Sequence, residues 1–391
     1  MPLPLRYNLR NVAVRRWTSA FTAGGIALVV AVTMLLAALV GGLKHMLIAT
    51  GEPDNLIVLR KGSTNDGSSF LPRDAAQVVR QLVGVARGLG GEPLASAEIV
   101  NQPFLRTREG RRENVLVRGV DPVALLVHRS VRLVAGRMFR PNLGEVVVGT
   151  GIAARYAGAR LGSRIEFGRR AWTVVGIFDS GGTAFDSEIW ADVADVQDDT
   201  RRPGYSGIRV TVAPGADRDA LVRRIEADGR FTLEAKPERA YYREQADSAN
   251  ALYVLVLTLA AVMATGATFG AVNTMYAAVA GRTPEIGTLR AIGFGRTAIL
   301  LAFLTESLLL AAGGLLAGLF LAAVAMLAIN TLLSGIAFSM MTFSVATVLL
   351  RPTAGGALLA VGFALAIGLF GGLAPAWRAA HLRVVDALHR A

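Results

Sequence analysis

Four long uncharged runs constrain this chain of 391 residues more than any other feature. They cover residues 20–43, 248–281, 297–350 (broken only by Glu306) and 353–377. Each is longer than the roughly 20 apolar residues that cross about 30 Å of hydrocarbon. A mixed-charge block of about 200 residues separates the first two runs, which is enough for a folded domain. The sequence therefore predicts a membrane protein with one large domain outside the bilayer.

The third run is long enough for two spans. Polar and small residues interrupt its second half, and Arg351-Pro352 leaves no room for a loop before the fourth run. Five spans would also place the basic C-terminal end on the far side of the membrane from the N-terminal end. We therefore interpret residues 297–330 as one span, followed by an apolar external loop or re-entrant turn over residues 331–352.

Basic residues gather at three of the short polar segments, although the whole chain carries a net charge of +12. By the positive-inside rule these segments are cytoplasmic, so the large block is extracytoplasmic and both ends face the cytoplasm. No basic stripe with interleaved aromatic residues is present, which favours membrane lipid over nucleic acid as the partner. The arginines concerned are Arg6, Arg10, Arg15, Arg16, Arg282, Arg290, Arg296, Arg378, Arg383 and Arg390.

The start of the chain combines arginines with apolar residues at helical spacing. Leu5, Leu9, Val12 and Trp17 recur on one side, which is typical of an interfacial amphipathic helix over residues 1–19. The alternative is a plain extension of the first span. The first apolar run is too long for a cleaved signal peptide, so we interpret it as a retained anchor. The chain has no cysteine, which excludes disulfides and thiolate metal sites.

The large block shows strand and helix patterns in a repeated order. Two small α/β halves flank a middle part that is rich in short strands and in loops with Gly and Arg. The first half has a strand at 55–60, a helix at 72–83 and a strand at 97–104, and the second has a strand at 207–212, a helix at 217–227 and a strand at 230–235. The middle strands are predicted at 113–119, 145–148, 164–167 and 171–178.

Motifs for catalysis and cofactor binding are weak or missing in this sequence. Residues 149–154 (GTGIAA) superficially match a dinucleotide fingerprint, but the helix that follows is too short, and a turn with a glycine helix start is the better interpretation. There is no GxxxxGK[ST] P-loop, no GxSxG elbow and no carboxylate pair that stands out. The four histidines, interpreted as surface or interfacial, are His45, His128, His381 and His389.

Small residues four positions apart recur in the predicted spans and favour close helix packing. The alternative is that glycine is simply common in membrane helices. Glu306 lies about two turns inside the third span and should face protein or water, since a carboxylate is costly in lipid. We interpret it as a structural hydrogen-bonding group, with a proton relay as the alternative. The glycine pairs are Gly266 with Gly270, Gly314 with Gly318, and Gly368 with Gly372.

Residues 282–295 predict a short helix between the second and third spans. Thr283 is a good N-cap, Pro284 suits the first turn, Glu285 complements the helix dipole, and Gly293 or Gly295 ends the helix. An exposed apolar face bounded by charges is suited to docking into a partner's groove. The alternative is an amphipathic loop lying on the bilayer. The predicted apolar face consists of Ile286, Leu289 and Ile292.

This stretch, RTPEIGTLRAIGFG, and Thr305-Glu306-Ser307 in the next span resemble the coupling region of MacB/FtsX-type (type VII, mechanotransmission) ABC transporter permeases. The resemblance extends over most of the chain. Residues 5–28 are similar to the family's entry helix and first span, 144–178 to its periplasmic domain, and 373–388 to its C-terminal signature. Arg383-Val384-Val385 departs from that signature, in which proline is common at this point.

The resemblance implies a non-enzymatic permease of the bacterial inner membrane. It implies a second permease copy and a separate cytoplasmic ABC ATPase that binds ATP and Mg, with no cofactor in this chain. ATP binding would draw the coupling helices together and tilt the second span, which at about 50 Å exceeds the bilayer. The outer α/β halves would then open and close. The ATPase-coupling residues implied are Pro284, Glu285, Ile286, Leu289, Arg290 and Gly293.

Two functions of different classes follow from the resemblance. The first is export of a lipid, peptide, drug-like or haem-like substrate with a periplasmic adaptor and an outer-membrane channel. The second is signal transduction without transport, in which a periplasmic hydrolase is activated as in cell division. The β-rich middle part favours export, because it resembles the surface to which adaptors bind.

The expected fold is a membrane domain of four transmembrane helices plus an α+β periplasmic domain, in which a porter-like α/β subdomain of two parts carries a β-rich insert. The expected segments are an amphipathic helix (1–19), transmembrane helix 1 (20–43), a periplasmic domain (44–247, porter-like 50–104 and 205–240, insert 105–204), transmembrane helix 2 (248–281), a coupling helix (282–296), transmembrane helix 3 (297–330), a periplasmic loop (331–352), transmembrane helix 4 (353–377) and a cytoplasmic tail (378–391).

Overall fold

The computed structural model of the chain describes residues 16–247, 250–332, 336–340 and 343–382. It divides into a helical unit (Met1–Gly41, Asn250–Ser334 and Leu350–Ala391) and an α/β unit (Gly42–Ala249 and Gly335–Leu349). Most of the predicted amphipathic helix and of the C-terminal tail lies outside the described residues.

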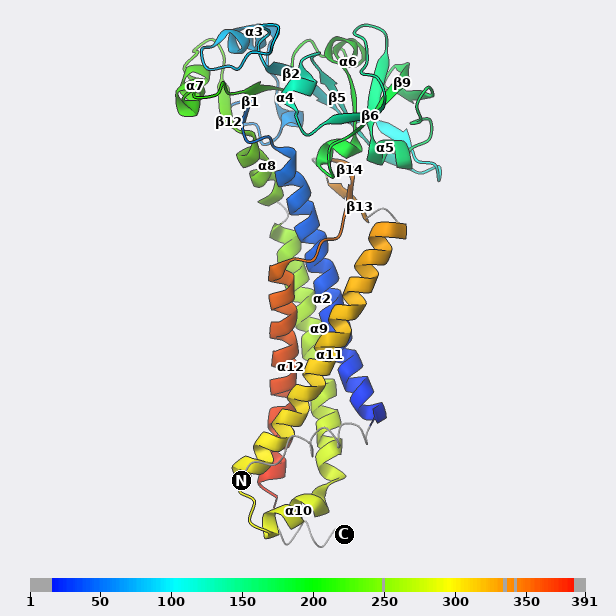
Figure 1. Cartoon of the computed structure of the whole chain (residues 1–391), viewed down its shortest axis with the longest axis vertical. Helices are drawn as coiled ribbons and strands as arrows, with labels where there is room; N and C mark the ends of the chain where they lie inside the picture. The colour runs from blue at the N-terminus through cyan, green and yellow to red at the C-terminus, as the bar shows by residue number, and fades with distance from the viewer. Residues whose placement is uncertain (1–15, 248–249, 333–335, 341–342, 383–391) are drawn as a thin grey trace. The chain divides into compact units, whose positions relative to one another are not determined.

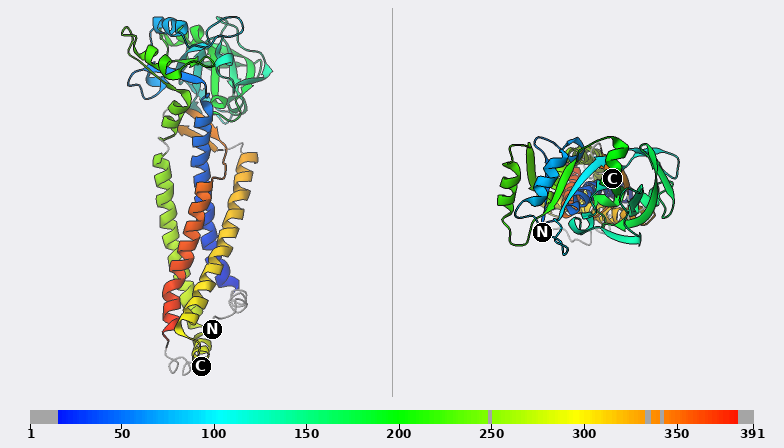
Figure 2. Two further views of the ribbon diagram at one scale, coloured as in Figure 1. Left: turned by 60° about the vertical axis from the view of Figure 1, so that its left-hand side comes forward. Right: turned by 90° about the horizontal axis from the view of Figure 1, so that it is seen from above.

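The helical unit is built from four long helices that run side by side in Figures 1 and 2. They are α2 (Arg16–Thr50), α9 (Asn250–Ala280), α11 (Arg296–Leu332) and α12 (Ala354–Ala380). In the part of the chain that is described, four helical stretches are long and apolar enough to cross a membrane, in agreement with the four predicted spans. Helix α2 continues seven residues past its predicted end at 43, because the apolar residues Met46 and Leu47 are buried and extend its packed face.

The α/β unit contains a ten-stranded sheet in the order β12-β1-β11-β2-β5-β10-β7-β9-β6, with β8 paired to β9 (Figures 1 and 2). Its pairs are antiparallel except for β5 with β10 and β7 with β9. The strands are β1 (Asn55–Arg60), β2 (Ala95–Asn101), β5 (Leu116–Val120), β6 (Arg132–Gly136), β7 (Glu145–Gly149), β8 (Arg164–Phe167), β9 (Arg170–Asp179), β10 (Glu188–Asp192), β11 (Gly207–Thr211) and β12 (Leu233–Pro237); β3 (Phe104–Arg106) and β4 (Arg112–Asn114) form a separate hairpin.

Short helices cover both faces of the sheet. They are η1 (Asp66–Ser68), α3 (Arg73–Gln81), α4 (Ala124–Val127), α5 (Thr150–Arg155), η2 (Ala184–Ser187), α6 (Val193–Thr200), α7 (Arg218–Glu226) and α8 (Glu238–Asp247). Strand β1 shows why both faces are needed, since side chains alternate along a strand. Leu56 and Val58 pack with α3 and α7, whereas Ile57 and Leu59 pack against two tyrosines of α8.

The predicted boundary between a porter-like part and an inserted part does not interrupt the sheet. Strand β2 pairs with β11 along one edge and with β5 along the other, so both parts share one set of backbone hydrogen bonds. Their apolar cores remain distinct. One lies under α3 and α7 and contains Leu221, and the other lies under α5 and α6 and contains Trp172.

Residues 331–352, predicted as an apolar loop or re-entrant turn, contain a β-hairpin instead. Strands β13 (Ile336–Met340) and β14 (Phe343–Val348) pair with each other and belong to the α/β unit. The hairpin satisfies backbone groups that an irregular apolar loop would leave unpaired. At its base, within the helical unit, Asn330 donates to the carbonyl oxygen of Leu350 (2.8 Å) and accepts from its amide (3.0 Å).

The glycines of the GTGIAA stretch have a packing role in the structure. A Cβ atom added to Gly149 would lie 2.3 Å from the carbonyl oxygen of Asp186, and one added to Gly151 would lie 2.8 Å from the same oxygen. The backbone of Asp186 therefore fills the space in which a dinucleotide phosphate would lie, which agrees with the interpretation of this stretch as a turn.

Candidate coupling site and a buried charge cluster

Helix α10 (Thr283–Ala291) joins α9 to α11. Pro284 lies in its first turn, and Gly293 follows its end with φ of 108°, a conformation that L-residues with a side chain rarely adopt. The prediction that Thr283 is the N-cap is wrong. Arg282 occupies the cap position, and the hydroxyl of Thr283 donates back to the carbonyl oxygen of Ala280 (3.0 Å). The threonine thus satisfies the end of α9 rather than the start of α10.

Arg282 and Glu306 form a bidentate ion pair that fixes this junction. The distances are 2.9 Å from Nη1 to Oε2 and 3.0 Å from Nη2 to Oε1. Both residues are buried, and the guanidinium also lies over the ring of Phe303. Parallel N–H···O bonds between a guanidinium and a carboxylate set orientation as well as energy. Glu306 therefore links α11 to the residue on which α10 starts.

Ile286 does not belong to an exposed apolar face. It is 2 % exposed and packs with Val279, Ile299, Phe303 and Ala379 at the ends of α9, α11 and α12. The prediction that Ile286 lies on an exposed apolar face is wrong, because the short connections fold α10 back onto those helix ends. Leu289 is half-buried, and Ile292 is 72 % exposed. One side of α10 thus serves as an anchor.

A second polar contact ties the far end of α10 to α12. Arg290 Nη1 donates to the carbonyl oxygen of Ala380 at 3.0 Å, where the last carbonyl groups of α12 have no helical partners. Arg378 in the same turn of α12 lies over the ring of Tyr276 on α9. Helix α10 is therefore held to the ends of all three helices around it.

The opposite side of α10 is open. Glu285, Thr288 and Ile292 are exposed, so the helix presents a carboxylate, a hydroxyl and an apolar side chain. One ion pair, one hydrogen bond to a backbone carbonyl and apolar packing fix the inner side of α10 to the helices that it joins. This arrangement is suited to passing a displacement from α10 to the neighbouring helices. Among the described residues, no group of three or more His, Asp or Glu side chains could hold a metal ion.

The predicted glycine pairs fall into two classes. A Cβ atom on Gly314 would lie 2.7 Å from Cβ of Ile26, and one on Gly318 would lie 2.6 Å from the carbonyl oxygen of Ala27, so this pair contacts α2. Gly368 and Gly372 contact α11 in the same way. For Gly266 and Gly270, no other part of the described chain lies within 4 Å of an added Cβ atom. The structure does not bring that pair to another helix.

The α/β unit contains a cluster of buried charges that the sequence analysis did not find. Four carboxylates, two guanidinium groups and one imidazole gather on one face of the sheet, beneath α8, η1 and α4. Alternate positions of adjacent strands supply several of them, as expected for side chains on one face. The buried charge cluster consists of Glu98 (β2), Arg118 (β5), Glu188 (β10), Arg209 (β11), Asp66 (η1), His128 and Glu238 (α8).

Hydrogen bonds connect the cluster without a break. Arg118 makes a bidentate pair with Glu188 (2.7 and 2.6 Å) and also donates to Asp66 and Glu98. Arg209 donates to Glu98, to Asp66 (3.2 Å) and to Glu238 (3.0 Å). Burial opposes ionisation of Glu98, but Arg209, His128 and Arg118 together outweigh it and hold the pKa of Glu98 well below its ordinary value. For Asp66, Arg118 and Arg209 likewise outweigh burial and lower the pKa.

His128 contradicts the prediction of a surface or interfacial histidine. It is fully buried, and its Nε2 lies 2.7 Å from Oε1 of Glu98. The sequence does contain a signal for the cluster, namely a single charge at the centre of an otherwise apolar strand. Arg118 in LVRGV and Arg209 in GIRVT are such charges, and a lone charge there must find a buried partner.

Two protein families match different parts of the chain, and the two matches correspond broadly to the α/β unit and the helical unit. Residues 19–228 match the MacB-like periplasmic core domain, and residues 257–384 match the FtsX-like permease C-terminal family. The chain belongs to the MacB/FtsX-type permeases. In this ABC transporter permease, α10 and Glu306 lie within the FtsX-like region, and the buried charge cluster lies within the MacB-like region except for Glu238. The chain is thus a multi-pass membrane protein.

Relatives of this MacB/FtsX-type permease include "Macrolide export ATP-binding/permease protein MacB" of Bdellovibrio bacteriovorus, at 24% identity over 98% of this chain and 61% of the relative. The protein of that name from Bradyrhizobium diazoefficiens is 26% identical over 99% of this chain and 60% of its own length. The chain thus spans about six tenths of these relatives. The solved periplasmic region of MacB from Actinobacillus actinomycetemcomitans matches 49% of this chain and 92% of its own, at 12% identity and a TM-score of 0.39.

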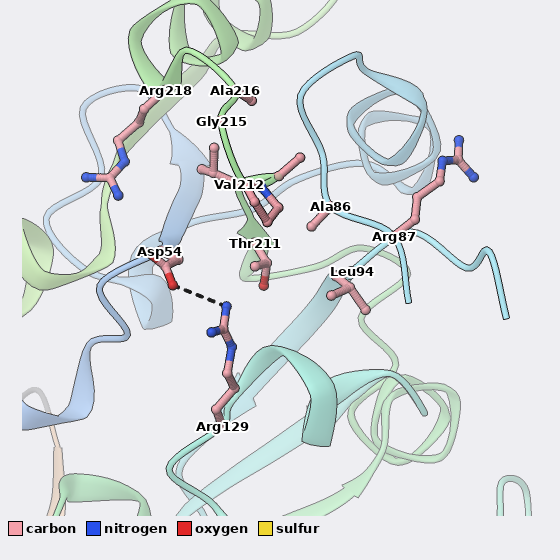
Figure 3. Close-up of a pocket in the computed structure, with 12 residues that line it drawn as sticks. Asp54, Ala86, Arg87, Leu94, Arg129, Thr211, Val212, Gly215, Ala216 and Arg218 are labelled. Atoms are coloured by element: carbon pink, nitrogen blue, oxygen red, sulfur yellow. Dashed lines mark ion pairs between the residues drawn. The ribbon is translucent and has the colours of Figure 1, made fainter. Parts of the chain in front are cut away.

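A pocket of about 590 Å³ opens in the α/β unit of this permease between the start of β1 and the start of α7. Figure 3 shows that Arg129 points toward Asp54, with which it pairs at 3.3 Å, while Arg87 and Arg218 lie on opposite sides. Arg218 donates to the carbonyl oxygen of Pro53, and Arg87 to that of Gly91. The guanidinium groups therefore do not converge on one point, and the pocket supports no specific ligand.

Proposed function

We propose that this chain is the permease subunit of an ABC transporter complex in which α10 receives the movement of a separate cytoplasmic ATPase. The observation that carries the proposal is the two-sided character of α10. Its inner side is fixed to α9, α11 and α12 through the Arg282–Glu306 pair, Ile286 and Arg290, and its outer side exposes Glu285 and Ile292. A helix built in this way passes a push on its outer side to the helices behind it.

The work of the complex would be done outside the bilayer. ATP and Mg would be bound by the ABC ATPase, since no P-loop occurs within these 391 residues. Movement of α10 would shift α9, which leads to the α/β unit, and the conformational change there would drive export of a substrate. Relatives of the chain are named for macrolide export, which supports a drug-like substrate, and a lipid, peptide or haem-like substrate is consistent with the same mechanism.

The proposed complex contains two permease copies in the bacterial inner membrane, with both chain ends in the cytoplasm. A periplasmic adaptor and an outer-membrane channel would complete the export path. The outward side of α9 supports pairing of two copies, because Gly266 and Gly270 are open and Phe269 is 71 % exposed. A helix face of this kind packs closely against another helix in a membrane.

Substitution on the outer side of α10 tests the proposal. The double variant Glu285→Ala/Ile292→Ala removes the exposed carboxylate and apolar side chain, and it leaves Ile286, Arg282 and Arg290 in place. We expect ATPase binding to weaken by about tenfold or more, as for loss of an interface anchor. The matched control is Val83→Ala, which removes an equally exposed apolar side chain from the α/β unit (76 % against 72 % for Ile292). Unchanged ATPase binding and coupled turnover in the double variant would contradict the proposal.

Affinity purification in mild detergent separates export from signalling. Export predicts an ABC ATPase and a periplasmic adaptor bound to the tagged chain. A murein hydrolase in place of the adaptor would favour the non-transporting alternative. Recovery of the permease without any ATPase would contradict both.

A further inference from the structure

Within the α/β unit, the end of α2 and the start of α8 meet at a single carboxylate. Helix α2 ends at Thr50 and β1 begins at Asn55, whereas β12 ends at Pro237 and α8 begins at Glu238. Oε2 of Glu238 accepts from the amide of Glu52 and from Nδ2 of Asn55, both at 3.1 Å. Its Oε1 accepts from Nε of Arg209 at 3.0 Å. The fully buried Glu238 therefore connects the incoming and the outgoing segments.

The backbones of the two segments also touch directly. A Cβ atom added to Gly51 would lie 2.9 Å from both the Cα and the amide nitrogen of Arg239. Real Cβ atoms do not approach backbone atoms so closely, so the residue after α2 has to be glycine for α8 to start where it does. Nε of Arg239 in turn donates to the carbonyl oxygen of Gly51 at 3.1 Å.

The incoming segment is fixed to the rest of the unit by two further contacts. The hydroxyl of Thr50 accepts from the amide of Ala184 in η2 at 3.0 Å. The carboxylate of Glu52 accepts from the amide of Ser130 at 2.8 Å. The end of α2 is thus attached to η2 and to the segment before β6, which lie beside a further apolar cluster of the unit that contains Val131 and Phe185. It cannot pivot against the sheet without breaking these contacts.

The outgoing segment is fixed through charge. Arg209 holds Glu238, and it also pairs with Glu98 and Asp66, which Arg118 links to Glu188 on β10. These contacts cross strands β11, β2, β5 and β10, which carry both apolar cores. Separation of α8 from α2 would remove the hydrogen bonds of Glu52 and Asn55 from the buried Glu238 carboxylate, and a buried charge that loses hydrogen bonds is costly.

We propose that Glu238 is a positioning residue that makes the end of α2 and the start of α8 one rigid body with the sheet. A displacement that arrives through α8 then turns the α/β unit as a whole. This differs from the expectation that two halves within one chain open and close. The inference rests on the proposed function only for the source of the displacement, and the rigid junction itself is a property of this chain.

Spin labels test the junction directly, since the chain has no natural cysteine. His45→Cys in α2 and Arg243→Cys in α8 are both at exposed positions of the α/β unit. Electron paramagnetic resonance of the labelled full chain in lipid nanodiscs is expected to give one narrow distance distribution. The isosteric Glu238→Gln variant is expected to broaden it and to shift its mean. The matched control is Glu244→Gln, a substitution on α8 that removes an exposed ion pair with Lys236 of β12.

A second variant keeps the test sharp if loss of the charge impairs folding. Gly51→Ala leaves every charge in place and inserts a methyl group between the two backbones, so it is expected to shift the same distance. Unchanged distributions in Glu238→Gln and Gly51→Ala, in protein with a parental thermal transition, would overturn the proposal. If these variants broaden the distance distribution but the parental protein binds no ATPase, the rigid junction is upheld and the proposed function is refuted. The two proposals can therefore fail separately.

Discussion

Arg282 and Glu306 lie 24 positions apart in the chain and face each other across a bidentate ion pair with N–O distances of 2.9 and 3.0 Å. The pair is buried where α9, α10 and α11 meet. Loss of one partner leaves an uncompensated buried charge, and loss of both leaves none. This relationship gives the helical unit a fixed point at the start of α10.

The pair predicts a non-additive double-mutant cycle. Arg282→Met or Glu306→Leu alone is expected to destabilise the protein by about 3–5 kcal/mol, because the remaining charge stays buried. The double variant is expected to recover most of that loss. Thermal unfolding of the three variants in detergent measures the effect. Additive losses in the double variant would show that the two residues do not stabilise one another.

The glycine pairs predict a contrast between helices. Gly318→Ala is expected to destabilise the protein by about 1–3 kcal/mol, because its Cβ atom would press on the backbone of α2. Gly270→Ala has open space and serves as the control within the same unit. Its expected effect on the unfolding of one chain is small. Cross-linking separately measures the association of two copies. Weaker cross-linking in Gly270→Ala would support the proposed pairing through α9.

The end of α10 predicts a backbone effect. Gly293 has φ of 108°, so Gly293→Ala is expected to introduce strain of about 1–3 kcal/mol and to displace the end of the helix. ATPase binding should weaken in this variant. Gly295→Ala is the matched control, since it lies two residues away without a positive φ and with only Thr297 nearby. Equal ATPase affinity in both variants would mean that the helix end has no part in coupling.

The buried charge cluster predicts acid sensitivity of the α/β unit. The pKa values of Glu98 and Asp66 lie below their ordinary values of 4.5 and 3.8, so ionisation of both groups stabilises the folded state. That contribution is fully present above about pH 4.5 and is lost as the pH falls through the lowered values. Hydrogen exchange of the β2 amides across this range measures it. Glu98→Gln should lower protection at neutral pH and flatten the acid dependence, and a steeper dependence would contradict the assignment.

Long uncharged runs in the sequence predicted the four helices of the helical unit, and local backbone signals predicted the limits of α10. Pro284 acts through its fixed φ and Gly293 through its tolerance of a positive φ, so both residues could be interpreted without tertiary information. Thr283 and Ile286 could not. A threonine hydroxyl bonds either forward or back, and the direction depends on where α9 ends. The burial of Ile286 depends on helix ends that are distant in sequence.

In the α/β unit, even more features depend on tertiary contacts that the sequence alone does not reveal. Strands such as β1 were predicted from their apolar pattern, whereas the continuity of the sheet depends on which strands pair with β2. The buried charge cluster was missed because each charge appears alone in its strand. His128 and Glu98 are 30 positions apart, and only the folded sheet brings them together. Pairing between strands is a tertiary property, which a single sequence does not specify.

The bond that Asn330 makes to the backbone of Leu350 closes the excursion between α11 and α12 at its base. These hydrogen bonds hold the end of α11 close to the segment that leads into α12, whatever the length of the chain between Asn330 and Leu350. Additional residues placed between β13 and β14 would cost only loop entropy, which grows by about 0.6 kcal/mol for each doubling of length. An epitope or a fluorescent reporter inserted between β13 and β14 is therefore expected to leave the ends of α11 and α12 held together.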